Sequence, residues 1–289
     1  MKLKMLARLA DYPRRYLAWL FSSLMNGNLS AGSQRAVLVT GADSSHYLSL
    51  VQFLESAERV EASSTVVVWN LGLSQGEKSQ LEARFPHAHF RDFPYHSLPS
   101  YFDIRVAAGE YAWKPVAIQM TAEEFCLGGN QRCLIWCDAG NVLFRKLRWV
   151  RRYTARHGVF SQYSGGTLGD WTHPDTLGHF SLEANALRRR NANAALVGLD
   201  PLSEAGATVL RLWAQLAEDK SVIAPEGSDR SNHRQDQAVL TCILISLGLL
   251  QDRAFRSKRT SEYRLHCDVE TGQGLNQVWG LSGRRLPGV

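Results

Sequence analysis

The sequence predicts an α/β domain with a mixed, Rossmann-like sheet and helices on both of its faces. From about residue 35 onward, short apolar segments of strand length alternate with segments of helical periodicity. Polar loops follow several of these strands, which is where α/β folds place their ligand sites. The 289 residues are 45% hydrophobic and 21% charged, a composition typical of a globular chain and not of a disordered one.

Most of the strands are predicted from short apolar runs, several of them rich in β-branched or aromatic residues. We expect strands at 37–40, 65–69, 89–93, 133–137, 158–160 and 194–197. Helices are predicted from apolar positions three and four apart, at 46–57, 74–84, 114–125, 200–217 and 235–247. Ser74 and Glu77 form a capping box at one helix start. Asp200 before Pro201 predicts another helix start, with the proline in the first turn.

The sequence divides into a basic segment with a linker at 1–33, a main domain at 34–270 and an irregular tail at 271–289. Much of the net charge of +6 lies at the start of the chain, where residues 1–25 form an amphipathic pattern with Trp19 and Phe21. Such a helix suits an anionic membrane surface. A signal peptide fits poorly because Asp11 and Pro13 interrupt the pattern, while a simply docked helix stays open.

Charge and cysteine content limit the partners and the cellular compartment that we expect for the protein. Beyond the basic start the chain is close to neutral, so we expect no nucleic-acid partner. The five cysteines are odd in number and none has C-x-x-C spacing, which favours free thiols in a reducing compartment. No apolar run reaches the roughly 20 residues needed to cross a bilayer. We therefore expect a cytoplasmic protein that attaches peripherally to the inner face of a membrane.

The first strand resembles the opening of a short-chain dehydrogenase, but the motif is incomplete. Gly41 is not followed by the further glycines that let a backbone approach a pyrophosphate. The Tyr-x-x-x-Lys pair is also missing, because Tyr111 and Lys114 are only three residues apart. The dehydrogenase interpretation is rejected, and a nucleotide site at the carboxyl end of the strand remains.

Asp138 is the first candidate for metal chemistry. The apolar strand ends at this carboxylate, and the small residues Ala139 and Gly140 follow it. A hard cation such as Mn²⁺ or Mg²⁺ takes oxygen ligands and leaves positions open for phosphate. The alternative is an aspartate that only caps a turn before glycine.

A second candidate is the polar loop at 224–237, which leads directly into an apolar helix. Asp236 and Gln237 stand in the first turn, where they can bind sugar hydroxyls or stabilise positive charge at a sugar carbon. Arg230 and Arg234 can hold phosphates through bidentate contacts. The alternative is an N-capping loop in which Asp236 complements the helix dipole.

Other candidates are scattered along the chain. Lys114 starts a helix beside Tyr111 and Trp113, where it can neutralise a diphosphate or extend to solvent. Trp171 and His173 lie in an aromatic loop suited to an acceptor, and His266 is a further possible metal ligand. A basic stretch at 145–156 is expected to be a solvated helix face.

Taken in order, these segments resemble the GT-A type of nucleotide-sugar glycosyltransferases over roughly residues 35–267. The landmarks are the first strand, Asp138 where the family carries its Asp-x-Asp, the strand at Asn193, and Asp236-Gln237 before a helix. The layout is most similar to the retaining branch that includes glycogenin and the lipopolysaccharide galactosyl- and glucosyltransferases. It is closer still to uncharacterised bacterial and nematode proteins that share the segments at 109–115 and 233–240.

The resemblance implies a donor such as a UDP-sugar held with Mn²⁺ or Mg²⁺, and it suggests where each residue acts. The implied donor-binding residues are Thr40, Asp43, Lys114, Asp138, Asn193, Arg230 and Arg234. The implied catalytic residues are Asp236 and Gln237, the acceptor-binding residues Trp171, His173, Glu226 and His233, and the metal ligands Asp138 and His266. Gly140 departs from the family because it stands where the second carboxylate of the Asp-x-Asp belongs.

The resulting hypothesis is a hexosyltransferase that moves a sugar to a glycan or lipid-linked acceptor, with retention implied by the resemblance. Two alternative hypotheses remain open. One is a non-catalytic protein that binds a glycan or a nucleotide with a degenerate transferase fold, which Gly140 favours. The other is a peripheral membrane protein whose N-terminal helix is the functional part.

Overall fold

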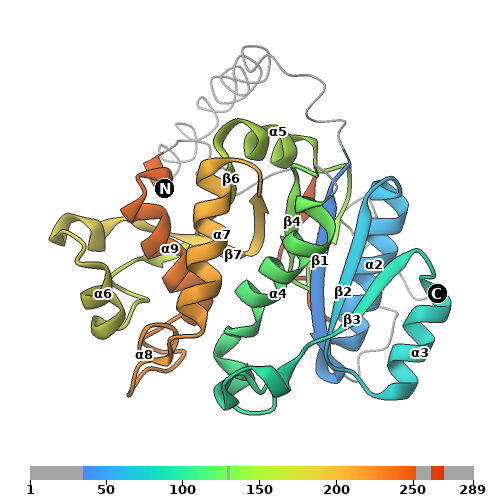
Figure 1. Cartoon of the computed structure of the whole chain (residues 1–289), viewed down its shortest axis with the longest axis horizontal. Helices are drawn as coiled ribbons and strands as arrows, with labels where there is room; N and C mark the ends of the chain where they lie inside the picture. Colours follow the sequence, from blue (N-terminus) through green and yellow to red (C-terminus); the bar gives the residue numbers. More distant parts are fainter. Residues whose placement is uncertain (1–34, 129–130, 252–261, 270–289) are drawn as a thin grey trace, which may run out of the picture.

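The computed structural model describes residues 35–128, 131–251 and 262–269 (Figure 1). The predicted N-terminal helix at 1–25, its linker and the tail at 271–289 lie outside these residues. None of the helices within the described ranges has both the length and the apolar character needed to span a bilayer.

A six-stranded sheet in the order β3-β2-β1-β4-β7-β6 forms the centre of the molecule. Its strands are β1 (Val37–Asp43), β2 (Thr65–Gly72), β3 (Ala88–Asp92), β4 (Leu134–Cys137), β6 (Val159–Thr167) and β7 (Arg190–Leu199). The first four are parallel, whereas β7 runs antiparallel to β4 and β6 antiparallel to β7. A small second sheet pairs β5 (Val142–Leu143) with β8 (Tyr263–Arg264). The predicted mixed sheet is confirmed.

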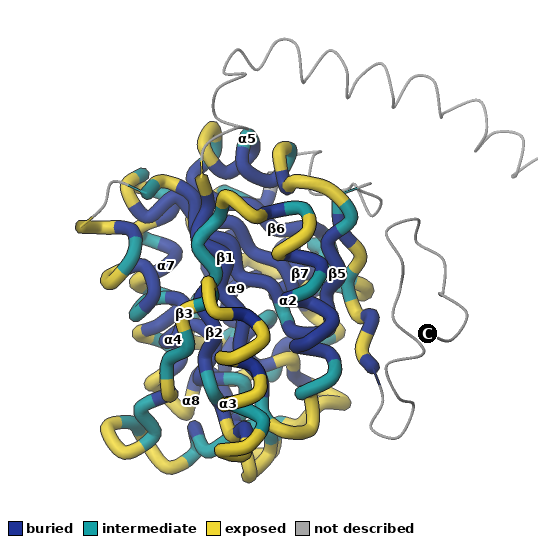
Figure 2. Tube along the Cα trace, turned by 90° about the vertical axis from the view of Figure 1, so that its right-hand side faces the viewer, coloured by how far each residue is buried: buried dark blue, intermediate teal, exposed yellow. Residues whose placement is uncertain are grey.

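Helices cover both faces of this sheet, as the sequence predicts. They are α2 (Tyr47–Glu61), α3 (Gln75–Arg84), α4 (Trp113–Ala122), α5 (Arg148–His157), α6 (Pro174–Phe180), α7 (Glu204–Ala217), α8 (Lys220–Ile223) and α9 (Gln235–Ser246). Figure 2 shows α4 and α7 on one side of the sheet and α2 with β5 on the other. The central strands β1 and β4 are therefore buried on both faces, which explains their continuous apolar sequences.

The predicted helix at 200–217 begins later than its sequence signal. Helix α7 starts at Glu204, because the Ser203 hydroxyl accepts a hydrogen bond from the Gly206 N–H at 3.0 Å and caps it. Asp200 is fully buried and forms an ion pair with Arg132 at 2.8 Å. Its carboxylate is thus engaged in a tertiary contact, which the local Asp-Pro pattern does not reveal.

Two strands are longer than predicted, and α6 occupies part of the expected aromatic loop. Strand β6 extends the segment 158–160 through Ser164 and Gly165 to Thr167, and β7 extends 194–197 in both directions. Polar and small residues interrupt the alternation there, while the neighbouring strand still supplies backbone partners.

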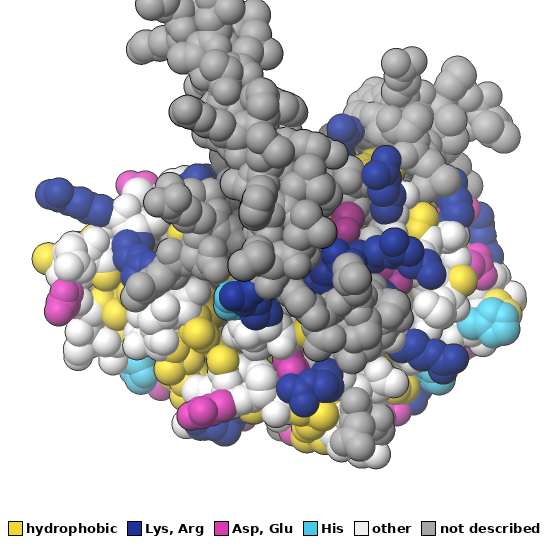
Figure 3. Space-filling model, turned by 90° about the horizontal axis from the view of Figure 1, so that it is seen from above, with side chains coloured by type: hydrophobic (Ala, Val, Ile, Leu, Met, Phe, Trp, Pro, Cys, Tyr) yellow, Lys and Arg dark blue, Asp and Glu magenta, His cyan; other side chains and the backbone are white. Residues whose placement is uncertain are grey.

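The basic stretch at 145–156 is only partly the solvated face that the sequence predicts. Arg145, Lys146, Arg148 and Arg156 are exposed, and Figure 3 shows Lys and Arg side chains on the face seen from above, where α5 lies in Figure 1. Arg151 differs, because it is 2% exposed and pairs with the buried Glu61 carboxylate of α2. Glu61 also accepts a hydrogen bond from the Leu147 N–H at 2.6 Å, so it anchors the start of α5.

We predict that Glu61→Gln lowers the free energy of unfolding by about 3 kcal/mol, because it removes the charge of the carboxylate that pairs with the buried Arg151 guanidinium. Urea unfolding at pH 7 measures the change. The matched control is Glu58→Gln on the exposed side of the same helix, expected to stay within about 0.5 kcal/mol of the unaltered protein. Equal effects of the two substitutions would contradict the prediction.

Candidate functional site

The candidate site lies where the direction of strand addition reverses. Strands β1 and β4 are parallel neighbours, and the chain extends from β1 to β2 and β3 on one side and from β4 to β7 and β6 on the other. Asp43 ends β1, and Asp138 directly follows β4. Open α/β sheets bind ligands at this kind of switch point, outside the carboxyl ends of the strands.

Lys114, Asp138 and Asp236 form a charged cluster at this point. The Lys114 ammonium lies 3.0 Å from Asp138 Oδ1 and 2.9 Å from Asp236 Oδ2. The Lys114 and Asp236 side chains are 5% and 8% exposed, whereas that of Asp138 is 32% exposed. The cluster joins the end of β4 to the first turns of α4 and α9. Three segments that the sequence singled out separately therefore meet at the Lys114 ammonium.

Burial and charge act in opposite directions within this cluster. Burial lowers the pKa of Lys114, but the Asp138 and Asp236 carboxylates outweigh it and raise that pKa overall. Burial likewise raises the pKa of Asp236, and the neighbouring ammonium opposes the shift. Lys114 is consequently a permanent positive charge in a nearly dry position, where electrostatic interactions are strong.

Two buried tryptophans hold the carboxylate-bearing segments in place. The Trp136 indole N–H donates to Asp138 Oδ1 at 2.6 Å, and the Trp213 indole N–H donates to the Asp236 carbonyl at 2.9 Å. Both rings are fully buried. Sequence reasoning missed them, because a tryptophan in an apolar strand or helix is indistinguishable from ordinary core.

A left-handed turn at 107–111 leads into Lys114. Its five residues have φ between 47° and 61°, and a Cβ on Gly109 would lie 2.3 Å from the Phe102 carbonyl oxygen. Such backbone is costly for other residue types and concentrates at functional sites. The turn places Glu110 to accept from Gln235 at 3.2 Å and the Tyr111 hydroxyl to accept from Arg230 at 2.9 Å. These hydrogen bonds join the loop at 224–237 to the turn that precedes Lys114.

The same loop also positions the aromatic segment predicted to bind an acceptor. The Arg234 guanidinium stacks over the Trp171 ring at 4.1 Å, and the Arg234 N–H donates to the Trp171 carbonyl at 3.1 Å. Glu226 and Arg234 are exposed. The candidate donor residue Arg234 and the candidate acceptor residue Trp171 are thus one unit.

His233 is buried inside this unit. Its Nδ1 accepts from the His173 backbone N–H at 3.2 Å, and its Nε2 lies 3.0 Å from the Ile223 carbonyl. A neutral ring with the proton on Nε2 satisfies both contacts. Because both ring nitrogens face backbone groups, His233 supports the acceptor-side loop and does not present a free nitrogen to a ligand.

Of the remaining predicted donor residues, Asp43 is partly exposed, and Thr40 and Asn193 are buried. At the end of β1, Asp43 Oδ1 lies 3.0 Å from His46 Nδ1, and this hydrogen bond is the main cause that lowers the pKa of Asp43 to about 2. Thr40 is fully buried, and its hydroxyl has no hydrogen-bond partner among the described residues. Asn193 is 6% exposed and accepts from the Ala195 N–H at 2.7 Å. Both Thr40 and Asn193 are thus buried at the sheet.

The turn after β4 brings in a carboxylate that sequence reasoning missed. A Cβ built on Gly140 would lie 2.0 Å from Asp268 Oδ1. Asp268 and Asp138 both raise the pKa of His46, after the larger effects of its hydrogen bond with Asp43 and of burial. His266 is exposed with φ of 56°, and no contact among the described residues brings it to Asp138. The sequence pointed to such a residue only indirectly, because Gly140 stands where the Asp-x-Asp carries its second carboxylate.

These donors fit a divalent cation held by few protein ligands. Among the residues that the structure describes, no three His, Cys, Asp or Glu side chains gather as a metal site. A Mg²⁺-like cation does not require three, since one or two carboxylates and substrate phosphates commonly hold it. Asp138 and Asp268 match that smaller donor set.

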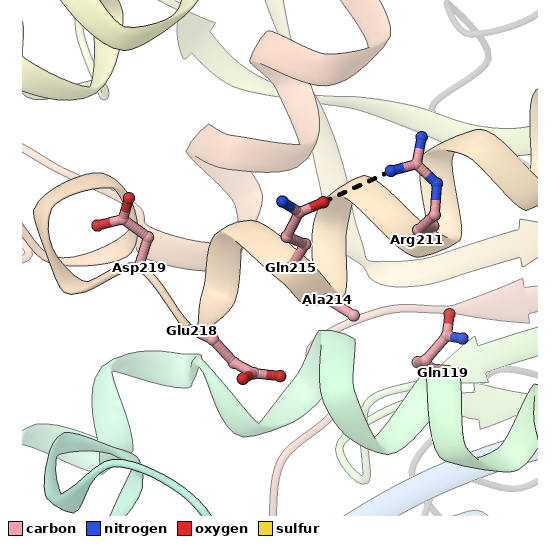
Figure 4. A pocket seen from close by; sticks show the side chains of 6 residues that line it. All are labelled: Gln119, Arg211, Ala214, Gln215, Glu218 and Asp219. Carbon is pink, nitrogen blue, oxygen red and sulfur yellow. Dashed lines mark hydrogen bonds between the residues drawn. The ribbon is translucent and has the colours of Figure 1, made fainter.

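A separate cavity of about 420 Å³ lies between α4 and α7 (Figure 4). It is lined by Gln119, Arg211, Ala214, Gln215, Glu218 and Asp219. None of these residues is among those predicted for donor, acceptor or metal. The chemistry therefore points to the charged cluster and not to this cavity.

Comparisons with known proteins agree with the fold. No family model matches the chain, and no curated protein matches it by sequence. The galactosyltransferase LgtC, solved with donor and acceptor sugar analogues, is similar with a TM-score of 0.51 and 12% identity, over 85% of this chain and 92% of LgtC. The chain therefore has the GT-A glycosyltransferase fold.

Two further solved structures are similar with lower scores. Mouse xyloside xylosyltransferase 1 has a TM-score of 0.44 and 15% identity, over 75% of this chain and 83% of that one. The bifunctional glycosyltransferase WbbM has a TM-score of 0.47 and 10% identity over 73% of this chain. The match spans only 37% of WbbM's length.

His233 makes the stability of the protein depend on pH. Burial lowers the pKa of His233 from 6.5 to about 4, so the folded state favours the neutral ring. This contribution is complete above pH 6.5 and is lost as the pH falls toward 4, by about 2–3 kcal/mol at pH 4.5. Unfolding curves at pH 7.5 and 4.5 should show a smaller pH-dependent loss in His233→Gln. The exposed His87→Gln serves as control, and an unchanged loss in His233→Gln would refute the assignment.

We predict that Lys114→Met lowers the free energy of unfolding by about 3–5 kcal/mol at pH 7, because Asp236 stays buried without its cation. Protonation of Asp236 then favours folding, so the variant regains stability relative to the unaltered protein as the pH falls. Adding Asp236→Asn should restore most of the loss. Denaturant unfolding of both single variants and the double variant tests this coupling, and simply additive losses would contradict it.

Proposed function

We propose that this chain is a glycosyltransferase that moves a hexose-type sugar from a nucleotide-diphosphate donor, with UDP-sugars favoured, to a glycan or lipid-linked acceptor. The observation that carries the proposal is the buried Lys114 ammonium between Asp138 and Asp236, at the ligand-binding end of a sheet with the GT-A fold. The solved LgtC complex, with its donor and acceptor sugar analogues, supports the same class of ligands.

The cluster suits the charges that develop as a sugar leaves a diphosphate. The leaving group gains negative charge, and the Lys114 ammonium would contribute to stabilising it. Positive charge develops at the sugar carbon, where the Asp236 carboxylate and the Gln237 side-chain oxygen can offset it. Asp138 would hold Mn²⁺ or Mg²⁺, which when bound would neutralise charge on the diphosphate oxygens. Retention of configuration is part of the proposal.

The rim of the site offers groups for both substrates. Arg230 and Arg234 are exposed, and their guanidinium groups suit bidentate contacts with phosphate. Trp171 supplies an aromatic face for an acceptor sugar, and His173 and the exposed Glu226 are the proposed polar contacts. The exposed basic side chains of α5 support an anionic, membrane-associated acceptor.

The alternative, a binding protein with a degenerate transferase fold, rests on Gly140. Burial of Lys114 and Asp236 weighs against it, because ions removed from water cost stability that a simple scaffold has no need to lose. Nucleotide binding without turnover would favour the alternative.

We predict that the full chain releases UDP from a UDP-hexose and that Asp236→Asn lowers the rate at least about 100-fold. UDP affinity, measured by calorimetry, should change less than about threefold, because the proposed contact is with the sugar. A panel of UDP-glucose, UDP-galactose and their N-acetyl forms, with Mn²⁺ present, identifies the donor. The control is Glu218→Gln, an exposed carboxylate at the end of α7. Equal turnover by Asp236→Asn would overturn the catalytic assignment.

A further inference from the structure

We propose that Asp268 supplies the second carboxylate of the cation site at Asp138, in place of the residue at position 140. The proposal rests on the proposed function, because the donor diphosphate would complete the coordination. It differs from the sequence-based expectation, which placed His266 beside Asp138 and left the second carboxylate missing.

The space beside Gly140 is taken up by the Asp268 carboxyl group. The three atoms nearest to a Cβ on Gly140 would all belong to the Asp268 carboxyl group, at 2.0, 2.5 and 2.8 Å. A side chain at residue 140 would therefore displace the Asp268 carboxylate from its present position. Glycine is the residue that lets a carboxylate from a distant segment lie against the turn after β4.

Hydrogen bonds hold the backbone on both sides of Asp268, two of them from buried side chains of α2. The Cys267 N–H donates to the Gly140 carbonyl at 2.6 Å, which joins the two segments directly. Gln52 Nε2 donates to the Cys267 carbonyl at 2.7 Å, and the Val269 N–H donates to Ser49 Oγ at 2.9 Å. Gln52 and Ser49 lie on α2 and are each 1% exposed. These contacts hold the backbone around Asp268 in place, and none of them involves the Asp268 carboxylate.

Charge also favours a cation at this place. Lys114 forms ion pairs with Asp138 and Asp236, and His46 interacts with Asp43, Asp138 and Asp268, so four carboxylates share these two basic groups. An anionic donor diphosphate would add to the excess of negative charge. Lys114 and Trp136 both contact Oδ1 of Asp138, whose side chain is 32% exposed, so this carboxylate can still take a further partner. Two carboxylates and phosphate oxygens form a donor set that suits Mn²⁺ or Mg²⁺.

The experiment measures Mn²⁺ binding to the full chain from the loss of the free Mn²⁺ signal in electron paramagnetic resonance, with and without UDP. Asp268→Asn and Asp138→Asn should each weaken Mn²⁺ binding at least about tenfold. The exposed Glu218→Gln should leave it unchanged. Circular dichroism and thermal unfolding confirm that each variant is folded. Mn²⁺ affinity unchanged in Asp268→Asn would overturn the proposal.

A relocation variant separates a ligand from a merely structural residue. Asp268→Gly should lose Mn²⁺ binding, and the double variant Gly140→Asp with Asp268→Gly should bind within about threefold of the unaltered protein. The exchange is sterically feasible, because the backbone of Gly140 is outside the left-handed region and Asp268 supplies the nearest atoms to its Cβ. A folded double variant that stays as weak as Asp268→Gly would count against the proposal.

The same variants distinguish failure of this proposal from failure of the proposed function. If Asp268→Asn binds Mn²⁺ normally and the unaltered chain still turns over a UDP-hexose, the cation ligand is wrong and the transferase stands. If the expected Mn²⁺ pattern appears but no nucleotide sugar is turned over, the cation site stands and the transferase proposal fails.

Discussion

The rest of the site depends on one interaction, the burial of the Lys114 ammonium between Asp138 and Asp236. Removing the Lys114 and Asp236 charges from water is costly, and the cost is offset only when distances and supporting hydrogen bonds are good. The contacts at 2.9 and 3.0 Å meet that condition, and they join β4, α4 and α9 at the switch point of the sheet. The two indole hydrogen bonds and the left-handed turn before Lys114 each hold one member of the cluster in position.

Carboxylates outnumber the cations that contact them at this end of the sheet. Lys114 balances one acid of the pair that it contacts, and His46 interacts most strongly with Asp43. The uncompensated charge lies on the open side of the turn after β4, beside Gly140 and Asp268. An anionic donor can bind at this place only with a further positive charge, whether from a divalent cation or from the rim arginines Arg230 and Arg234.

The acceptor side is organised by a different kind of contact. Arg234 stacks on Trp171, and the buried His233 joins the backbone of His173 to that of Ile223. The two histidines look equivalent as sequence, since both stand in polar loops. In the structure His233 is buried within the loop, whereas His173 caps α6 and is partly exposed. Burial therefore distinguishes the histidine that supports the loop from the one that can reach a ligand. Residues proposed for acceptor binding therefore include one whose contribution is to hold the others.

By itself, the sequence determined the mixed α/β sheet, the strand that ends at Asp138 and the helix that begins beside Asp236. These features follow from local periodicity, because side chains repeat every two residues in a strand and about every 3.6 in a helix. Only the tertiary structure decided that Lys114 meets both carboxylates, that Asp268 fills the space beside Gly140 and that Arg151 is buried with Glu61. The partners in these contacts are separated by 90 to 128 residues of the chain. The exception is Lys114 and Asp138, which are separated by 24 residues. A periodic pattern records which face of an element is apolar, but it carries no information on which distant element packs there.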